Sequence, residues 1–597
     1  MENPNINAQA AVTEAQYWAT WGAARDGART VLTRRQAALL IVIVASSIVL
    51  VAVSLHTLVV TLLALSTTVY FLTGIYKLAL LVRGEHALSR IAIASQPAEG
   101  DDLPMYTILV PLHREGKMLP VLIERLVAID YPPDCLEVLL LIESDDGETR
   151  NVLRRCALPF FIRPVIVPAG RPRTKPRALN VGLAQARGEH LVIYDAEDHP
   201  EPSQLRKAVT AFRQAPPEVA CLQARLNFYN RKQTLLTRLF AVDYASWYDQ
   251  LLPGLARTGA FVPLGGTSNH FRIAALRKMG GWDPFNVTED CDLGARLSRA
   301  GIQISMLDSV TMEEAVPHAW PWIRQRSRWI KGFLQTYLVH MRHPFRLWRQ
   351  FGSVGFIDFQ LLVGGTCVVL LINPFMWALT VAYIAGAGTQ VDAFIESLFP
   401  AWLYYPSLLC LVAGNFVFFY INAYVCVRHD YINLTRYALL TPLYWVLMSI
   451  GAWAGLFSFL RHPHYWAKTD HGSSLRAREL VFTTRSDAPM QHAESRHSAI
   501  DSASSSAAVA GDGDVSSGSA RTAAHRERER GLAWRSLMGR EPNTPPGRRA
   551  LTPIIDRGVT PLANTPSSSR RWTWRQITDA LHITTAAEPD SRRIDGQ

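Results

Sequence analysis

The strongest constraint on this chain is a long stretch without any charged side chain, which runs from Arg35 to Lys77. At about 1.5 Å per residue, a helix over this stretch would be roughly 60 Å long, about twice the ~30 Å hydrocarbon core of a bilayer. The stretch is too long, and begins too late in the chain, for a cleaved signal peptide. We therefore predict two transmembrane helices within residues 36–82, joined near His56.

Three further uncharged blocks cover residues 359–391, 397–427 and 437–460. The first contains Asn373-Pro374, which either splits the block into a hairpin or kinks it. If each block crossed the membrane once, the Arg-rich C-terminal tail would end outside, against the preference of Lys and Arg for the cytosol. Four crossings keep the tail inside, as do three blocks of which one lies in the interface. We predict four crossings here and six spans in total.

The basic residues predict the orientation of the chain. The formal net charge is +11, with much of the excess arginine near the N-terminus and in the tail. Arg25, Arg29, Arg34 and Arg35 precede the first span, which predicts a cytosolic N-terminus and a return to the cytosol at Arg83. Such flanks face anionic membrane lipid. No nucleic-acid-binding motif accompanies the charge, so we expect no nucleic-acid partner.

Residues 100–350 show the alternation of strands and helices that is typical of a mostly parallel sheet with helices on both faces. Stretches with helical spacing, such as 118–129 and 178–187, separate short apolar runs that end in polar clusters, at residues 106–111, 136–142, 164–168 and 191–195. In such sheets the ligand binds at the carboxyl ends of the strands. The residues that follow each strand are therefore the candidates for a functional site.

Acidic clusters stand at these positions, at residues 143–147, 195–198 and 287–292, and a Gln-x-x-Arg-Trp sequence follows at 325–329. Carboxylates at one edge of a sheet repel one another unless a cation or hydrogen-bond donors offset the repulsion. Oxygen-rich sites of this kind suit Mg²⁺ or Mn²⁺ bridging a diphosphate. Each cluster alone is typical of a solvated turn, but their order within one domain flanked by spans favours a diphosphate site.

In this order the motifs resemble those of the processive family 2 glycosyltransferases, which include cellulose, chitin and hyaluronan synthases. The resemblance covers about residues 35–470. It implies an α/β GT-A-like (Rossmann-like) cytosolic domain inserted between α-helical transmembrane segments. It also implies an inverting hexosyltransferase that needs Mg²⁺ or Mn²⁺. The Tyr-Asp-Ala-Glu-Asp sequence at residues 194–198 looks more like that of bacterial glucan-synthase relatives than that of chitin or hyaluronan enzymes. This resemblance implies UDP-glucose as the donor.

The resemblance assigns the nucleotide to loops after the first strands. The first strand and its loop match the segment that covers the uracil, which implies contacts from Pro111, His113 and Glu115. The Asp-Asp-Gly match implies that Asp145 and Asp146 help to hold the nucleotide.

The next two matches imply diphosphate and metal contacts. Lys175 and Asn180 match the family's Lys-Ala-Gly-Asn-Leu-Asn, whose lysine faces the diphosphate. Asp195 and Glu197 occupy the Asp-x-Asp metal position, with Glu in place of the second Asp. Because Asp198 is adjacent, which carboxylate touches the metal stays open.

The Thr-Glu-Asp match implies that Asp290, beside Glu289, is the general base that takes the proton from the acceptor hydroxyl. Gln325, Arg328 and Trp329 match Gln-x-x-Arg-Trp on an interfacial helix. There the tryptophan offers a flat face to the acceptor sugar and the arginine addresses the diphosphate.

Two further matches concern the acceptor. Gly266 and Thr267 lie where the family has a glycine-containing acceptor loop. Trp466 resembles the gating segment of hyaluronan- and chitin-type synthases, although an interfacial aromatic belt explains it equally well.

Together these predictions divide the chain into six parts: a cytosolic segment (1–35), two transmembrane helices (36–82), a glycosyltransferase domain with interfacial helices (100–350), a transmembrane region (355–460), a gating-like segment (461–486) and a basic tail (487–597). The tail has too few large apolar residues to offset its ordering entropy, so we expect disorder. The expected location is the inner (plasma) membrane, multi-pass, with the catalytic domain and both termini cytosolic. The expected partners are a nucleotide sugar, a glycan acceptor and membrane lipid; the sequence identifies no export partner.

Two other functions stay open beside a polysaccharide synthase. A single-transfer glycosyltransferase that acts on a lipid acceptor would share the nucleotide and metal residues. It would not need the Gln-x-x-Arg-Trp helix or so many later spans. A catalytically inactive membrane assembly subunit would be indicated by loss of Asp290 or of the acidic clusters, and all of these are present.

Overall fold

The structure is a computed structural model, and it describes residues 27–94, 97–98, 100, 102–259 and 261–465. The described residues all fall within one of the two units of the chain, Met1–Thr483. Three predicted features lie outside the described residues: Trp466 in the gating-like segment, the C-terminal tail, and most of the segment before the first span.

An eight-stranded sheet forms the centre of the predicted glycosyltransferase domain, in the order β3-β2-β1-β4-β7-β6-β8-β5. The pairs β3-β2, β2-β1, β1-β4 and β6-β8 are parallel, while β7 is antiparallel to both neighbours and β5 to β8. The predicted mostly parallel sheet is therefore a mixed sheet. Its strands are β1 (Tyr106–Leu112), β2 (Leu136–Glu143), β3 (Ile162–Val167), β4 (His190–Ile193), β5 (His199–Pro200), β6 (Val219–Phe228), β7 (Asn269–Arg272) and β8 (Gln303–Glu313).

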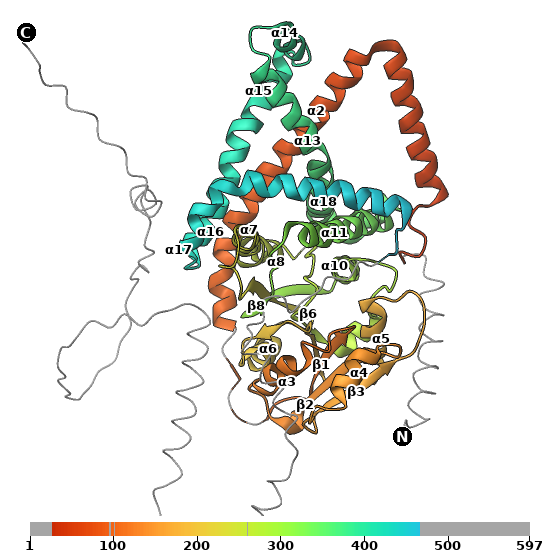
Figure 1. Cartoon of the computed structure of the whole chain (residues 1–597), viewed down its shortest axis with the longest axis vertical. Helices are drawn as coiled ribbons and strands as arrows, with labels where there is room; N and C mark the ends of the chain where they lie inside the picture. The colour runs from red at the N-terminus through yellow and green to blue at the C-terminus, as the bar shows by residue number, and fades with distance from the viewer. Residues whose placement is uncertain (1–26, 95–96, 99, 101, 260, 466–597) are drawn as a thin grey trace, which may run out of the picture. The chain divides into compact units, whose positions relative to one another are not determined.

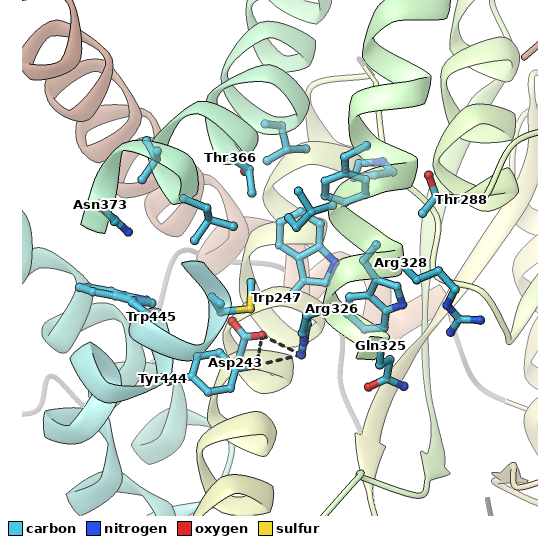
Figure 2. A pocket seen from close by; sticks show the side chains of 18 of the residues that line it. Asp243, Trp247, Thr288, Gln325, Arg326, Arg328, Thr366, Asn373, Tyr444 and Trp445 are labelled. Atoms are coloured by element: carbon cyan, nitrogen blue, oxygen red, sulfur yellow. Dashed lines mark hydrogen bonds and ion pairs between the residues drawn. The ribbon is translucent and has the colours of Figure 1, made fainter. Parts of the chain in front are cut away.

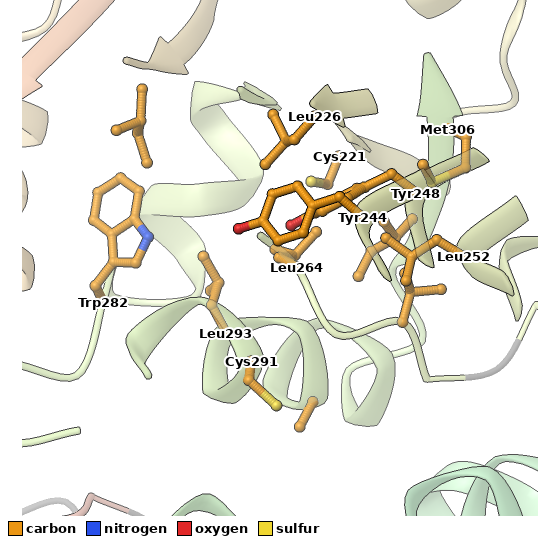
Figure 3. Packing of buried hydrophobic residues seen from close by; sticks show 14 of the residues in the cluster. Cys221, Leu226, Tyr244, Tyr248, Leu252, Leu264, Trp282, Cys291, Leu293 and Met306 are labelled. Carbon is orange, nitrogen blue, oxygen red and sulfur yellow. The ribbon is translucent and has the colours of Figure 1, made fainter. Parts of the chain in front are cut away.

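Both faces of the sheet are covered. Along β1, Leu109 belongs to one hydrophobic cluster and Ile108 to another, as side chains that alternate along a strand must. Figure 3 shows the first cluster, in which Tyr244 and Tyr248 pack against residues of β6 and of the segment before β7. Because both faces are buried, the strands are apolar throughout, which explains the continuous apolar runs in the sequence.

Ten α-helices lie between β1 and residue 359 of the described chain. They are α3 (Leu119–Val127), α4 (Gly147–Leu153), α5 (Lys175–Gln185), α6 (Gln204–Gln214), α7 (Leu235–Tyr244), α8 (Leu252–Arg257), α9 (Ile273–Lys278), α10 (Glu289–Arg299), α11 (Ala319–His340) and α12 (Pro344–Phe359). Shorter helical segments are η1 (Pro133–Cys135) and η2 (Ala245–Leu251), which continues α7.

Among the described helices, four stretches are long and apolar enough to cross a membrane: Arg34–Glu85, Pro344–Ala385, Ala401–Arg428 and Ile432–Arg461. The elements that form these stretches are α2 (Arg34–Ala94, of which Arg34–Glu85 counts), α12, η3 (Gln360–Gly364), α13 (Gly365–Ala385), α15 (Ala401–Leu409), η4 (Cys410–Gly414), α16 (Asn415–Arg428), α17 (Ile432–Thr435), η5 (Arg436–Leu440) and α18 (Thr441–Arg461). The short α14 (Gln390–Ser397) lies between α13 and α15.

Helix α2 is bent into two arms (Figure 1). The backbone leaves helical geometry at Ser54, two residues from the junction predicted at His56. At the start of the first arm, Nε2 of Gln36 donates to the carbonyl of Leu338 in α11, 2.7 Å away. Near the end of the second arm, Nε2 of Gln250 in η2 donates to the carbonyl of Leu81, also at 2.7 Å. Both ends of α2 therefore contact the catalytic domain.

Helix α18 packs along α11 instead of standing apart from the catalytic domain (Figure 1). Gly451 and Gly455 form the contact: a Cβ atom at Gly455 would lie 2.7 Å from the carbonyl oxygen of Ser327. Small residues four apart allow two helix backbones to approach this closely. Further along, Nζ of Lys331 donates to Oγ of Ser458 at 3.2 Å.

Candidate active site

A cavity of about 1810 Å³ extends from the sheet edge to the apolar helices. Most of the residues predicted from the sequence line it: Pro111, His113, Glu115, Lys175, Asp195, Glu197, Gly266, Thr267, Glu289, Asp290, Gln325, Arg328 and Trp329. Figure 2 shows the part of the wall near Gln325 and Arg328, together with Asn373 and Trp445 from the apolar helices. Motifs that are far apart in the sequence thus converge on one space.

Lys175 is the centre of the polar end. Its Nζ donates to Oδ1 of Asp195 at 2.5 Å and to the carbonyl of Gly266 at 2.8 Å. Burial opposes the charged form, but the carboxylates of Asp195 and Glu289 raise the pKa of Lys175 above its ordinary value. Lys175 is also the first residue of α5, so its ammonium and the helix N-terminus both favour an anion.

Gly266 marks the meeting point of three segments. A Cβ atom there would lie 3.5 Å from Oδ2 of Asp290 and 3.8 Å from Nζ of Lys175. An added methyl group would therefore be in van der Waals contact with both the predicted base and the predicted diphosphate ligand. The absence of a side chain at Gly266 keeps the space between these two residues open.

The loop after β4 gathers carboxylates. The backbone N–H of Asp195 and the hydroxyl of Thr267 both donate to Oδ2 of Asp198, the former at 2.7 Å. The other oxygen of Asp198, Oδ1, is buried without a hydrogen-bond partner. Burial, with the charges of Asp195 and Glu197, raises the pKa of Asp198 well above its ordinary value.

Glu313 at the end of β8 is a cavity residue that the sequence reasoning missed. Burial and the charges of Asp198 and Glu197 raise its pKa well above the ordinary value. The sequence contains a signal for it: Glu313 ends a strand and Glu314 follows it, so this pair stands at a strand end as the other acidic clusters do.

This donor set fits a divalent cation in its chemistry. A hard cation would offset the mutual repulsion of these clustered carboxylates, whose pKa values are raised. It would also give a partner to the buried Oδ1 of Asp198, which accepts no hydrogen bond from any described residue. In the described part of the chain, however, no three Asp, Glu, His or Cys side chains are arranged around one ion position. A cation here would thus take few protein ligands and complete its shell with diphosphate oxygens and water, as Mg²⁺ commonly does.

Glu289 and Asp290 open helix α10 with different proton affinities. Burial, and next the charge of Asp290, raise the pKa of Glu289 to about 8. Burial raises the pKa of Asp290 only to about 6, because the backbone N–H of Cys291 and the cation of Lys175 oppose the rise. The pair therefore binds protons more tightly than free carboxyl groups do, Glu289 more strongly than Asp290, and ionised Asp290 is the form that a general base requires.

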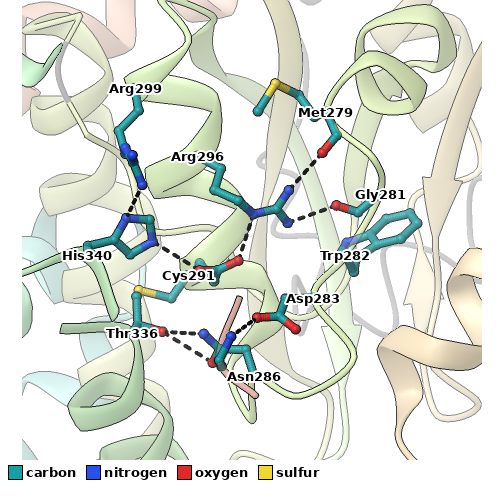
Figure 4. A network of polar contacts seen from close by, with 12 residues as sticks. Met279, Gly281, Trp282, Asp283, Asn286, Cys291, Arg296, Arg299, Thr336 and His340 are labelled. Carbon is teal, nitrogen blue, oxygen red and sulfur yellow. Dashed lines mark hydrogen bonds and ion pairs between the residues drawn. The ribbon is translucent and has the colours of Figure 1, made fainter. Parts of the chain in front are cut away.

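A buried polar network fixes α10 behind this pair (Figure 4). Asp292 accepts from Nε of Arg296 at 2.8 Å and contacts Nε2 of His340 at 3.0 Å. Nη1 of Arg299 lies 3.2 Å from Nδ1 of His340, so Nδ1 accepts and the ring proton is on Nε2. Although burial opposes it, Arg296 and His340 lower the pKa of Asp292 to about 2. The network therefore keeps Asp292 ionised.

Helix α11 holds the segment that precedes Asp290. Oε1 of Gln335 accepts from the backbone N–H of Val287 at 2.9 Å, and its Nε2 donates to the carbonyl of Phe285 at 2.9 Å. Nδ2 of Asn286 donates to Oγ1 of Thr336 at 3.0 Å. Helix α11 also contains Gln325, Arg328 and Trp329. The same helix therefore carries the Gln-x-x-Arg-Trp motif and holds residues 285–287, which precede the predicted base Asp290.

Three predicted residues do not line the cavity. Asn180 exchanges two hydrogen bonds with the backbone of Trp282, at 2.8 and 3.0 Å. Asp146 caps α4 and accepts from the backbone N–H of Arg114 at 2.6 Å, which shapes the loop that carries His113. Asp145 is exposed and pairs with a second arginine, Arg173, at 2.5 Å. Arg173 does line the cavity.

The end of the described chain reaches the cavity as well. His464 and Tyr465 line it. Nζ of Lys331 donates to the carbonyls of His462, at 3.2 Å, and of Tyr465. The residue predicted to gate, Trp466, comes immediately after this tether.

Comparison with known proteins agrees with this geometry. The model of the family "Glycosyltransferase like family 2" matches residues 104–332. Those residues are a family 2 glycosyltransferase domain. The protein is thus a glycosyltransferase, and the α/β GT-A-like fold predicted from the sequence is confirmed.

Similar proteins are bacterial and plant enzymes. "Probable glycosyltransferase YdaM" of Bacillus subtilis (strain 168) is 24% identical over 333 residues, which are 51% of this chain and 79% of that protein. "Glucomannan 4-beta-mannosyltransferase 2" of Arabidopsis thaliana is 29% identical over 241 residues, 39% of this chain and 45% of that protein. The chain therefore spans about half the length of this plant relative.

Among solved structures, the mannosyltransferase PcManGT from Pyrobaculum calidifontis in complex with GDP-Man and Mn²⁺ matches with a TM-score of 0.42 and 19% identity. The match covers 66% of this chain and 99% of that one.

Proposed function

We propose that this protein is a membrane-embedded inverting transferase that moves a hexose from a nucleotide sugar to a growing β-linked polysaccharide. One observation carries the proposal: the cavity that contains Lys175 and Asp290 continues past Trp329 to residues of the apolar helices, among them Trp377 and Tyr404. An aromatic-lined path that leads away from the base is suited to a product that stays bound while it grows. A single-transfer enzyme for a lipid acceptor, or an inactive assembly subunit, would not need it.

The proposed chemistry follows from the groups at the polar end. The acceptor hydroxyl attacks the anomeric carbon and gives its proton to Asp290, while the bond from that carbon to the diphosphate oxygen breaks. Lys175, the N-terminus of α5 and Arg328 stabilise the charge on the departing nucleoside diphosphate. Asp195 and Glu197 would hold Mg²⁺ or Mn²⁺, which supplies further charge neutralisation when bound.

The donor is either of two nucleotide sugars. UDP-glucose is the donor expected from the sequence motifs. GDP-mannose is the second candidate, because the names of the plant relatives specify mannosyl transfer. Glucose and mannose differ only in the configuration at one carbon, so both fit the same base and diphosphate ligands.

We also propose an inner-membrane location with a cytosolic catalytic domain. The contacts of both ends of α2 with the catalytic domain support two crossings by α2. The packing of α18 along α11 supports an interfacial position for the last of the three later uncharged blocks, residues 437–460. Four crossings in total then return the chain to the catalytic side, two fewer than the six predicted from the sequence.

The test is transfer from a labelled donor. Purified protein in detergent is incubated with radiolabelled UDP-glucose or, in parallel, GDP-mannose, with Mg²⁺ or Mn²⁺, and the products are sized. High-molecular-weight material from one donor is expected. Label confined to a small lipid-soluble product would contradict the polymerase and favour the single-transfer enzyme, and no incorporation from any nucleotide sugar would favour the inactive subunit.

A further inference from the structure

Arg326 lies within the Gln-x-x-Arg-Trp motif, but its surroundings differ from those of Arg328. Arg328 lines the cavity together with Asp195 and Glu289, which places it at the donor end; burial lowers the pKa of Arg328, and the charges of these two carboxylates oppose that shift. Arg326 is 3% exposed and is enclosed by aromatic rings at the junction between the catalytic domain and the apolar helices. The two arginines of the motif are therefore placed for different tasks.

The guanidinium of Arg326 is stacked between rings. It lies 4.2 Å from the centroid of Trp329 and 4.3 Å from that of Phe240, with Trp322 at 5.1 Å and Tyr444 at 5.9 Å. Only a flat cation can lie against several rings in this way. One face of Trp329 is therefore occupied by the guanidinium, and a sugar can meet only the rest of the indole.

The polar contacts of Arg326 join three helices (Figure 2). Nη2 donates to the hydroxyl of Tyr444 in α18 at 2.8 Å and lies 3.5 Å from Oδ2 of Asp243 in α7. The Tyr444 hydroxyl donates to the same Asp243 oxygen at 2.9 Å. Arg326 belongs to α11, so this single side chain connects α7, α11 and α18 beside the cavity.

This arrangement is costly as a stabilising device. The ion pair to Asp243 is long, and within the described part of the chain Nε of Arg326 is buried without a hydrogen-bond partner. An apolar side chain of similar length would fill the same space without desolvating a charge. We therefore attribute to the planar, charged guanidinium of Arg326 the role of holding its neighbours in place. Two of these neighbours, Trp329 and Tyr444, line the cavity.

We propose that Arg326 is a positioning residue for the acceptor glycan: it fixes the orientation of the Trp329 indole and ties that ring, through Tyr444 and Asp243, to α18 and α7. The inference rests on the proposed function and deepens it, because it assigns a residue to the acceptor subsite alone. Donor binding and donor hydrolysis, in which water replaces the acceptor, do not involve Arg326.

The test compares Arg326→Lys and Arg326→Met with wild type, all as full-length protein in detergent. Arg326→Lys keeps the charge and loses the plane. Arg324→Lys is the matched control, since Arg324 is exposed on the same helix. Three quantities are measured: the Kd for UDP or GDP, the rate of donor hydrolysis without acceptor, and the KM for the soluble probes cellotetraose and mannotetraose.

We expect both Arg326 variants to raise the acceptor KM about tenfold, as loss of desolvated cation–π contacts would. Nucleotide Kd and donor hydrolysis should stay within about twofold of wild type, and Arg324→Lys should match wild type throughout. Tyr444→Phe, which removes only the hydroxyl, should raise the acceptor KM by a smaller factor in the same direction.

Two results would overturn the inference. An unchanged acceptor KM in Arg326→Lys would show that the plane of the side chain does not position the acceptor. A parallel loss of nucleotide affinity and hydrolysis would assign Arg326 to the donor site or to folding. Failure of the proposed function looks different, because wild type itself would then transfer no sugar to either probe.

Discussion

The two ends of the cavity are built in different ways. The donor end consists of charged side chains that directly follow strands or open helices, such as Asp195 after β4 and Asp290 in α10. The end toward the apolar helices consists of aromatic and amide side chains from segments far apart in the chain, such as Trp329, Asn373 and Tyr444. Under the proposed function, the charged groups of the first end carry out the transfer and the shape of the second end guides the product. The two ends should therefore fail differently when they are altered.

The largest effect is expected at the base. Asp290→Asn should lower sugar transfer about a thousandfold, because the amide cannot accept the proton of the acceptor hydroxyl. Nucleotide affinity should stay close to that of wild type, as measured by titration calorimetry with UDP and GDP. Asp134→Asn is the surface control, since Asp134 is exposed. Transfer at the wild-type rate by Asp290→Asn would remove Asp290 from the mechanism.

The next effect concerns the diphosphate. Lys175→Met should weaken nucleotide diphosphate binding by about 10- to 100-fold, because it removes a charged donor and leaves Asp195 without its cation. The same calorimetric titration measures this loss. Lys232→Met, at an exposed position, is the control. If Lys175→Met bound the diphosphate as tightly as wild type does, the donor end would lie elsewhere.

The pH dependence should also distinguish the two ends. Because the pKa of Asp290 is raised to about 6, donor hydrolysis should fall as the pH drops through that value, about tenfold for each further pH unit. Rates measured between about pH 5 and pH 8 would show this limb. The limb should persist unchanged in Arg326→Lys. An acid limb near the ordinary pKa of a carboxyl group would mean that Asp290 is not in a buried environment during turnover.

At the other end, Trp377→Ala should shorten the product several-fold, because an aromatic platform for a sugar ring is lost. Initial donor hydrolysis should not change. Sizing the labelled polymer by gel filtration measures the effect. Trp402→Ala is the matched control, because Trp402 is 64% exposed and is not among the cavity residues. Equal product lengths in Trp377→Ala and wild type would contradict a role of the aromatic end in binding the product.

The smallest effect is on stability. The pKa of Asp290 is higher in the folded than in the unfolded state, so folding favours the protonated form. That contribution is present below the unfolded pKa and is lost as the pH rises through about 6. At neutral pH, Asp290→Asn should thus raise the free energy of unfolding by roughly 1 kcal/mol, read from thermal unfolding. A lower unfolding temperature at neutral pH would contradict the assigned burial of this charge.

Much of the donor end was predictable from the sequence, for a physical reason. A strand end and the residues after it are adjacent in the chain, so the position of Asp195 or Lys175 follows once the strand and helix pattern is recognised. The bend of α2 near His56 was predictable too, because the length of an apolar stretch limits how it can cross a bilayer.

The rest depended on packing that a sequence pattern does not contain. Asn180 and Asp146 belong to family motifs, yet neither lines the cavity. Asn180 hydrogen-bonds to the backbone of Trp282, and Asp146 to the backbone of Arg114. Glu313 enters the acidic cluster because β8 pairs with β5, the short strand that directly follows Asp198, and this contact joins segments far apart in the chain. The position of α18 along α11 depends on Gly451 and Gly455 meeting a partner helix that hydropathy alone does not identify.

The most direct test of the account asks whether the product follows the cavity. The protein is reconstituted in lipid vesicles with the catalytic domain outside and is supplied with the labelled donor that it uses. A glucanase or mannanase is then added outside. We expect labelled polymer that resists digestion until detergent opens the vesicles. Complete digestion without detergent would show that the polymer is released on the donor side, and it would contradict a path through the apolar helices.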